Sequence, residues 1–268
     1  MKSKPKPKPR RKPKPRAKTP AEEKNWAFRS FLMVLLLIAF GSFGWWWQGQ
    51  VLVQRVSFSG VNHAQEEVLR EMIRVDSSLL FFDLSPMMIA DRLRRHPWVE
   101  DANVQRYPNA TLSIEVTERK PVMLHIDEDG RPDRYLDARG FQMPFLKEAV
   151  YDVPLVSGLT ERMNTIRPIE HRALQKLLLE MKQIPPRVDA LVSAFEIEST
   201  GEISLHTAPK PGRGSIEVLL GRDQFVEKLS RLYAFWHEAV LEKEDVSFAS
   251  IDLRFDSQII TKEVRLSQ

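Results

Sequence analysis

The chain has 268 residues, of which 43% are hydrophobic and 28% are charged, proportions that are ordinary for folded protein. Ten of its Lys and Arg residues lie within the first 20 positions, so the remaining 248 residues carry 30 basic against 36 acidic side chains. The chain contains no cysteine, which excludes disulfides, thiol catalysis and Cys-ligated zinc.

Residues 1–28 form a basic tail. From Lys2 to Pro20 the sequence alternates Lys or Arg with Pro and has almost no apolar residue to offset the entropy of ordering, which predicts a disordered segment. The tail lacks interleaved aromatic residues on which bases could stack. We therefore expect it to set membrane topology and contact anionic lipid, with nucleic-acid binding as the less favoured alternative.

Residues 29–49 have the properties of a transmembrane anchor. No charged residue occurs between Ser30 and Gln54, and a helix of the 18 residues up to Trp47 would span about 27 Å, close to the hydrocarbon thickness of a bilayer. The apolar run ends in three bulky tryptophans where a signal peptidase needs small side chains, so an uncleaved anchor is favoured over a cleaved signal peptide. The positive tail predicts a cytoplasmic N-terminus and periplasmic C-terminal domains, a single-pass type II topology in the bacterial inner membrane.

Residues 50–119 are predicted to fold in the order β-α-α-β-β. A strand over 51–58 precedes a helix over 63–74, for which Asn62 is the predicted N-cap with Gln65 three residues later. A second helix starts at Ser85-Pro86 and ends near His96, and strands over 99–106 and 111–118 follow.

This order and the sequence His-Pro-Trp-Val-Glu-Asp-Ala-Asn-Val-Gln-Arg-Tyr-Pro resemble the POTRA domain of the FtsQ/DivIB family of bacterial cell division proteins. The flanking sequences Val-Ser-Phe-Ser-Gly-Val and Glu-Val-Thr-Glu-Arg-Lys-Pro-Val also resemble that POTRA domain. The motif residues are Pro97, Trp98, Val99 and Arg106. By residue type they mark the fold more than a site, since Trp98 suits a core or rim position, Pro97 stops a helix and Arg106 suits a solvated strand end.

Residues 120–268 are predicted to form a second, mixed-sheet β domain with two helices, so the overall fold class is α+β. Short strands alternate with turns, one amphipathic helix covers 169–181, another follows Phe225, and a last strand runs from Phe248 to Ile260. The strings Val-Leu-Leu-Gly-Arg and Ile-Asp-Leu-Arg-Phe resemble the β domain of the same family, so the resemblance covers essentially the whole chain.

No pattern in the chain indicates catalysis, a metal or a cofactor. The acidic run at 127–130 lacks the ligand spacing of a calcium loop and suits a hairpin turn, and the six histidines are scattered singly. Hydrolase and phosphate-loop motifs are absent from the sequence. We therefore expect no enzyme activity and no small-molecule substrate, with an anchored cell-wall hydrolase as the minor alternative.

The family resemblance implies a non-enzymatic scaffold at the division septum that binds FtsB and FtsL in the periplasm and links early and late division proteins. It implies that partners add to the edge of the last strand. The predicted contact residues are Arg254, Phe255, Asp256, Ser257 and Ile259. Because Phe255 shares a strand face with apolar residues, its assignment to the interface or the core stays open. The alternative function is a POTRA scaffold for outer-membrane protein assembly or secretion.

Overall fold

The structure is a computed structural model that describes residues 20–48, 50–74, 80–209, 214–240, 246–256 and 258–265. The chain divides into two compact units. The first contains the long N-terminal helix, the segment up to Leu52 and the turn Leu80–Asp83, and the second contains the other described residues. The segment predicted to be disordered, residues 2–20, lies outside the described residues except for Pro20.

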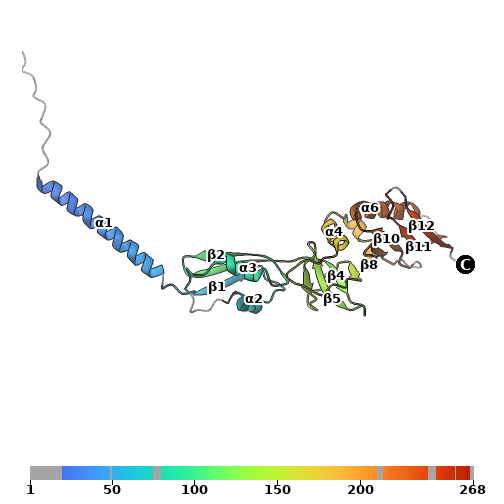
Figure 1. The fold of residues 1–268 in the computed structure, drawn as a ribbon, viewed down its shortest axis with the longest axis horizontal. Coiled ribbons are helices and arrows are strands. Elements are labelled where there is room, and N and C mark those ends of the chain that lie inside the picture. Colours follow the sequence, from blue (N-terminus) through green and yellow to red (C-terminus); the bar gives the residue numbers. More distant parts are fainter. Residues whose placement is uncertain are drawn as a thin grey trace, which may run out of the picture. The chain divides into compact units, whose positions relative to one another are not determined.

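The first unit is dominated by helix α1, Pro20–Gln48 (Figure 1). It begins ahead of the predicted anchor because Pro20 suits the first turn of a helix and Ala, Glu, Glu and Lys, which follow, are good helix formers. Its residues Phe28–Trp47 are long and apolar enough to cross a membrane, and the large apolar side chains in this span are exposed.

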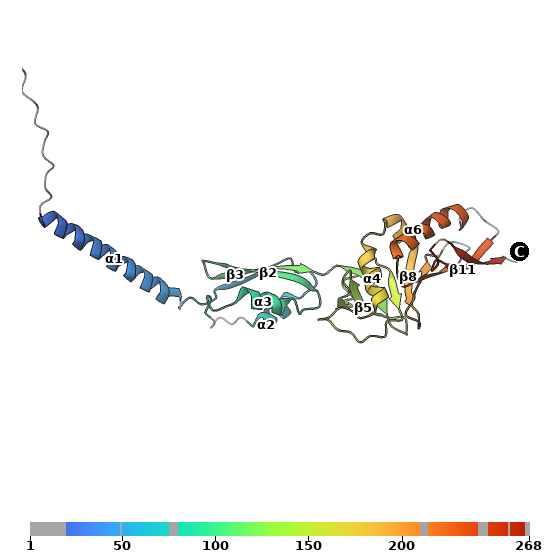
Figure 2. The same cartoon turned by 45° about the horizontal axis from the view of Figure 1, so that its top comes forward.

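The first domain of the second unit has the predicted order β-α-α-β-β, with two helices on one side of a small sheet (Figure 2). In the sheet β3 lies between β1, which is parallel to it, and β2, which is antiparallel. The elements are β1 (Arg55–Ser59), α2 (Glu66–Ile73), α3 (Pro86–Leu93), β2 (Val99–Tyr107) and β3 (Thr111–Glu118).

The predicted start of the first helix is wrong. Gln65, and not Asn62, occupies the N-cap position of α2. The backbone N–H groups of Asn62, His63 and Ala64 each donate to Glu118 Oε1 at 2.8 Å, so this stretch wraps around a carboxylate before the helix can begin. The second helix begins as predicted, since the hydroxyl of its N-cap Ser85 accepts from the amide of Met88 at 3.4 Å.

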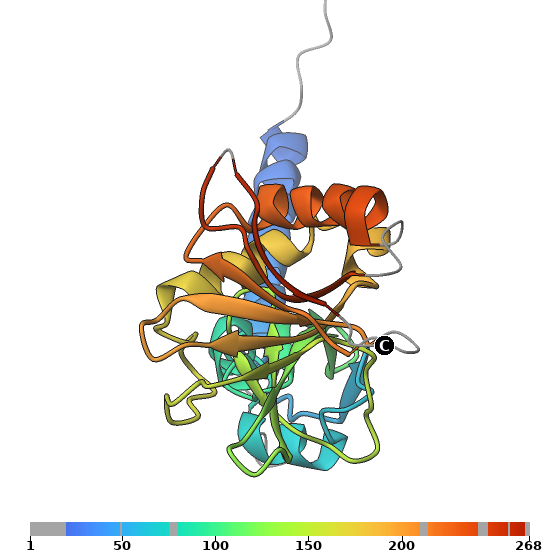
Figure 3. The same ribbon diagram turned by 90° about the vertical axis from the view of Figure 1, so that its right-hand side faces the viewer.

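The second domain is built on a nine-stranded mixed sheet in the described residues, with strand order β12-β11-β10-β9-β8-β7-β4-β5-β6. Helices α4 and α6 pack through apolar side chains onto this sheet, and Figure 3 shows α6 lying across its C-terminal strands. The elements are β4 (Pro121–Ile126), β5 (Pro132–Asp137), β6 (Gln142–Pro144), β7 (Leu155–Ser157), α4 (Arg172–Met181), α5 (Pro186–Asp189), β8 (Val192–Ile197), β9 (Ile203–Thr207), β10 (Glu217–Gly221), α6 (Phe225–Phe235), a π-helical turn (Trp236–Val240), β11 (Val246–Asp252) and β12 (Ile260–Arg265). The α+β class is therefore confirmed.

The two domains of this unit share one apolar cluster at their junction. Buried residues of the first domain, including Trp98 and Val116, belong to the same cluster as Leu124, Tyr135 and Met143 of the second. The rest of the second domain has a separate core between its sheet and helices. The burial of Trp98 therefore requires side chains from both domains.

Candidate partner-binding site

The C-terminal end of the large sheet presents a free strand edge. Strand β11 pairs with β10 in parallel on one side and with β12 antiparallel on the other. Within the part of the chain that the structure describes, no strand pairs with the outer side of β12. An unpaired edge offers a row of backbone donors and acceptors to another extended segment.

The predicted single strand from Phe248 to Ile260 is wrong, because it is two strands joined by a connection at 253–259. The guanidinium of Arg231, on α6, donates to the carbonyls of Leu253 and Phe255 at 3.1 Å and also to that of Asp256. Consecutive carbonyls point to opposite sides in a strand, so two neighbours cannot converge on one cation unless the chain turns. Arg231 therefore holds the chain out of the sheet at this point.

The predicted contact residues lie mainly in this connection and not on a strand. Phe255 is 50% exposed, so it is not a core residue. Asp256 is exposed, and Ile259 is half-buried against the core under the sheet. Ser257 lies outside the described residues. The structure thus brings Phe255 next to the turn that leads into the free edge strand, whose first residue, Ile260, is 48% exposed.

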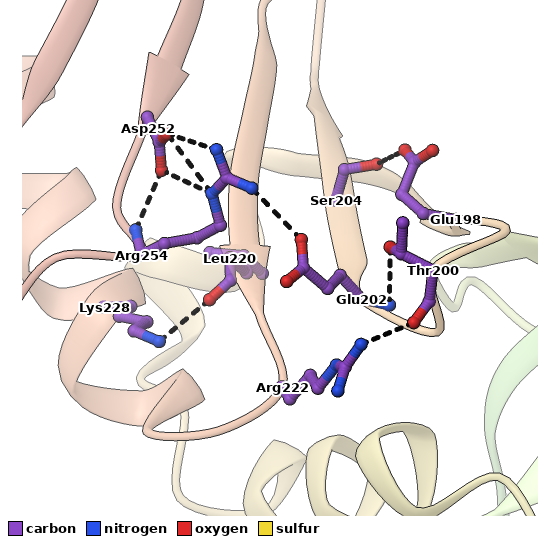
Figure 4. Close-up of polar contacts among 9 residues, drawn as sticks. All are labelled: Glu198, Thr200, Glu202, Ser204, Leu220, Arg222, Lys228, Asp252 and Arg254. Carbon is purple, nitrogen blue, oxygen red and sulfur yellow. Dashed lines mark hydrogen bonds and ion pairs between the residues drawn. The ribbon is translucent and has the colours of Figure 1, made fainter.

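Arg254 is held by carboxylates of its own chain (Figure 4). Its guanidinium binds both oxygens of Asp252 at 2.7 to 3.2 Å and reaches Glu202 Oε2 at 3.1 Å. The hydrogen bond to Asp252 is the main cause that raises the pKa of Arg254, and the same bond lowers the pKa of Asp252. Arg254 therefore positions the end of β11 against the residue that precedes β9.

Two basic residues that shape this site were missed by the sequence reasoning. Lys228 is 3% exposed, and its Nζ donates to the carbonyl of Leu220 at 2.9 Å (Figure 4). Arg231 holds the connection as described above. Lys228 directly precedes Leu229 on the apolar face of α6, and a lysine at a helical position that also carries buried residues was the available signal. Nothing local to Arg231 distinguishes it from a solvated helix residue.

Gly221, at the end of β10, is required by the same packing. Its φ is +82°, a conformation that side chains disfavour, and a Cβ there would lie 3.3 Å from Cγ of Arg254. The glycine therefore lets the Arg254 side chain cross close to the backbone of β10.

Of the POTRA motif residues, Trp98 and Val99 lie in the apolar cluster at the junction of the two domains, whereas Arg106 lies toward the other end of β2, where it pairs with Leu112. Trp98 is 2% exposed and Val99 is fully buried, while Arg106 is exposed and donates to the carbonyl of Leu84 at 3.3 Å. Pro97 lies in the turn between α3 and β2. The ring of Trp98 stacks on those of His63 and Tyr151, with centroids 5.2 and 6.3 Å apart.

Glu118 ties the loop ahead of α2 to this aromatic group. Besides its three backbone donors, it lies 3.1 Å from Nδ1 of His63, whose ring is within 3.4 Å of the Tyr151 hydroxyl. Burial raises the pKa of Glu118, but the hydrogen bonds from Ala64, Asn62 and His63 outweigh burial and hold it below its ordinary value. The carboxylate is thus a structural anion that joins β3 to the α2 loop.

The described residues that most resemble a catalytic arrangement line a groove between the β4–β5 hairpin and the loop at 157–163. There Nδ1 of His125 lies 2.9 Å from Asp133 Oδ2, and burial lowers the pKa of His125. In the described chain no hydroxyl lies within hydrogen-bonding distance of this histidine, although Ser157 and Thr160 line the groove. The described residues also include no group of three or more His, Asp or Glu side chains arranged to hold a metal ion.

Two family models together match residues 51–262 of the chain. A model for the POTRA domain, FtsQ-type, matches residues 51–119, and a model for the FtsQ/DivIB C-terminal related domain matches residues 120–262. The POTRA match is to the type found in division proteins, so it does not favour the alternative of outer-membrane assembly.

Curated proteins give the same result. The chain is 40% identical to the cell division protein FtsQ of Rhodothermus marinus over 250 residues, which cover 92% of this chain and 91% of that protein. It is 36% identical to the cell division protein FtsQ of Salinibacter ruber, over 87% of this chain and 91% of the relative. With the corresponding protein of a Geobacter species the identity is 30%, over 92% and 94%.

Proposed function

Because the chain belongs to the FtsQ/DivIB family of cell division proteins, we propose that it is a non-enzymatic scaffold that binds FtsB and FtsL through the outer edge of β12. The observation that carries this proposal is the outer edge of β12, with which no strand of the described residues pairs at the end of the nine-stranded sheet. In this role the protein links early and late division proteins during septum assembly.

The membrane arrangement follows from the single apolar helix. Residues Phe28–Trp47 cross the inner membrane once, the basic tail stays in the cytoplasm, and the two folded domains lie in the periplasm at the septum. In this arrangement β12 is available to the exported segments of other single-pass proteins.

Strand addition explains how such a surface can bind without a deep pocket. Backbone hydrogen bonds along β12 supply affinity, and neighbouring side chains select the partner. Phe255 is the apolar anchor, because it is half exposed just before the strand while Arg231 holds its backbone in place. An aromatic anchor that enters a pocket of the partner is a common hot spot of an interface.

Two adjacent proline variants of β12 test this mode of binding. Consecutive amides in a strand point to opposite sides, so of Thr261→Pro and Lys262→Pro one removes an amide facing β11 and the other removes an amide facing the partner. Thermal unfolding identifies the variant that keeps its stability, and that variant is expected to lose binding to the periplasmic segments of FtsB and FtsL. Lys262→Ala, which keeps the amide and removes only the exposed side chain, is the matched control. Unchanged binding by both folded proline variants would exclude the edge of β12.

Depletion in living cells tests the broader role. Loss of a division scaffold is expected to produce filaments without septa, and a plasmid copy should restore division. A copy with the outward-facing proline variant should reach the membrane and fail to restore it. If that variant divides normally, the β12 proposal is wrong while the division role stands.

A further inference from the structure

The segment that leaves the membrane is tied to a turn far along the sequence. The amide of Phe81 donates to the carbonyl of Val51 at 2.8 Å, and Leu52 pairs with Leu80 in an antiparallel bridge. The turn closes on itself through the amide of Asp83 and the carbonyl of Leu80. Residues Leu80–Asp83 therefore belong to the same compact unit as the membrane helix.

The distance from the membrane edge to this turn is short. Helix α1 ends at Gln48, directly after Trp45, Trp46 and Trp47, whose side chains are 84%, 60% and 58% exposed. Tryptophans at the end of a span lie at the level of the lipid headgroups. Val51 follows Trp47 by four residues, so the two lie at most about 14 Å apart, and the amide of Gln50, which donates to the carbonyl of Trp47, shortens the path.

The turn presents apolar surface at this level. Phe82 is 42% exposed and Leu52 is 46% exposed, whereas Phe81 is buried and contacts Phe82 edge to face at 5.3 Å. Phe81 thus forms a fixed base for a projecting aromatic ring. Aromatic and aliphatic side chains gain free energy on entering the boundary between headgroups and acyl chains.

We propose that the turn Leu80–Asp83 is a second membrane contact, in which Phe82 and Leu52 insert into the headgroup layer of the periplasmic leaflet beside the tryptophans of α1. The occupant of this apolar surface is the lipid bilayer itself, because the surface is continuous with the membrane span through Val51. Two points of attachment restrict rotation of the exported chain about a single helix. This inference depends on the membrane span and not on partner binding at β12.

The natural lack of cysteine allows a direct test in the full chain. Single-cysteine variants Phe82→Cys and Leu52→Cys are labelled with an environment-sensitive fluorophore and reconstituted in nanodiscs of phosphatidylethanolamine and phosphatidylglycerol. Val150→Cys is the matched water-exposed control, since Val150 is 79% exposed in the second domain. Phe43→Cys, within the span, is the control for the hydrocarbon region.

The labels at positions 82 and 52 should show blue-shifted emission, quenching by lipids with a nitroxide near the headgroup, and loss of quenching by aqueous iodide. A second variant shows whether insertion depends on the native side chain and not on an apolar label. Phe82→Asp, combined with the label at position 52, should reduce lipid quenching at position 52 without changing thermal unfolding. Iodide quenching equal to that at position 150 would overturn the proposal. Protection from both iodide and lipid quenchers would also overturn it, since protein would then cover the turn.

Discussion

Arg119 and Asp137 form an ion pair of 2.7 Å at the junction of the two folded domains, and their side chains are only 5% and 7% exposed. The Arg119 guanidinium also lies 4.0 Å from the centre of the Phe141 ring. The backbone amide of Arg119 donates to the carbonyl of Trp98. Asp137 Oδ1 accepts from the amides of Arg139 and Phe141. This buried pair therefore connects the end of β3 to the turn after β5.

Arg119→Ala is expected to lower the free energy of unfolding of the two folded domains by about 3 to 5 kcal/mol, because it leaves the Asp137 charge buried without its partner. Chemical denaturation of residues 50–268 measures this change. Arg131→Ala is the matched control: the Arg131–Asp129 pair is 76% and 68% exposed, so its loss should cost less than about 1 kcal/mol. Equal effects of the two variants would contradict a structural role for the buried pair.

Glu118→Gln should make the free energy of unfolding less dependent on pH in the acidic range. The pKa of Glu118 is below its ordinary value in the folded chain, so its ionised form stabilises the fold above the unfolded pKa of about 4.3. That contribution is lost as the pH falls through the folded pKa. At pH 7 the variant should be about 1 to 3 kcal/mol less stable than the parent.

The difference between parent and Glu118→Gln should shrink when unfolding is measured at successively lower pH, down to the acid limit of the fold. Glu115→Gln is the control, since Glu115 is an exposed residue of the same strand. A difference that stays constant with pH would mean that the ionised carboxylate is not the stabilising species.

Phe255→Ala tests whether Phe255 acts as a surface residue in partner binding or as a core residue in folding stability. Because half of the side chain is exposed, its removal should change the free energy of unfolding by less than about 1 kcal/mol, whereas truncation of a buried phenylalanine costs about 3 to 5 kcal/mol. Phe225→Ala, on the buried face of α6, provides that comparison. Loss of about 2 kcal/mol or more of partner binding without loss of stability would support Phe255 as an anchor.

The tail should tolerate substitution. The ten positive charges of the first 20 residues exceed what the orientation of a single span requires, so replacing half of the Lys and Arg residues between Lys4 and Arg16 by Gln should leave the C-terminal domains in the periplasm. Protease accessibility in spheroplasts measures this. Protection of those domains from protease would show that the full charge is needed.

Local signals were sufficient for most elements. The start of α3 at Ser85-Pro86, strand β3 and the apolar span follow from caps, alternation and hydropathy, which act between residues close in sequence. The motif around Trp98 likewise indicated the family, and the matches confirm it.

Long-range contacts decided the rest. Glu118 captures the amides of Asn62 to Ala64 across more than 50 residues and moves the start of α2, which no local capping rule contains. Arg231 draws three carbonyls of the 253–256 segment to one cation and divides the last strand in two. The exposure of Phe255 follows from that division. The sequence by itself determined the apolar span, the order of elements in the first domain and the family, because these depend on neighbouring residues. The division of the last strand and the exposure of Phe255 depend on Arg231 and on carbonyls that only the fold brings to it.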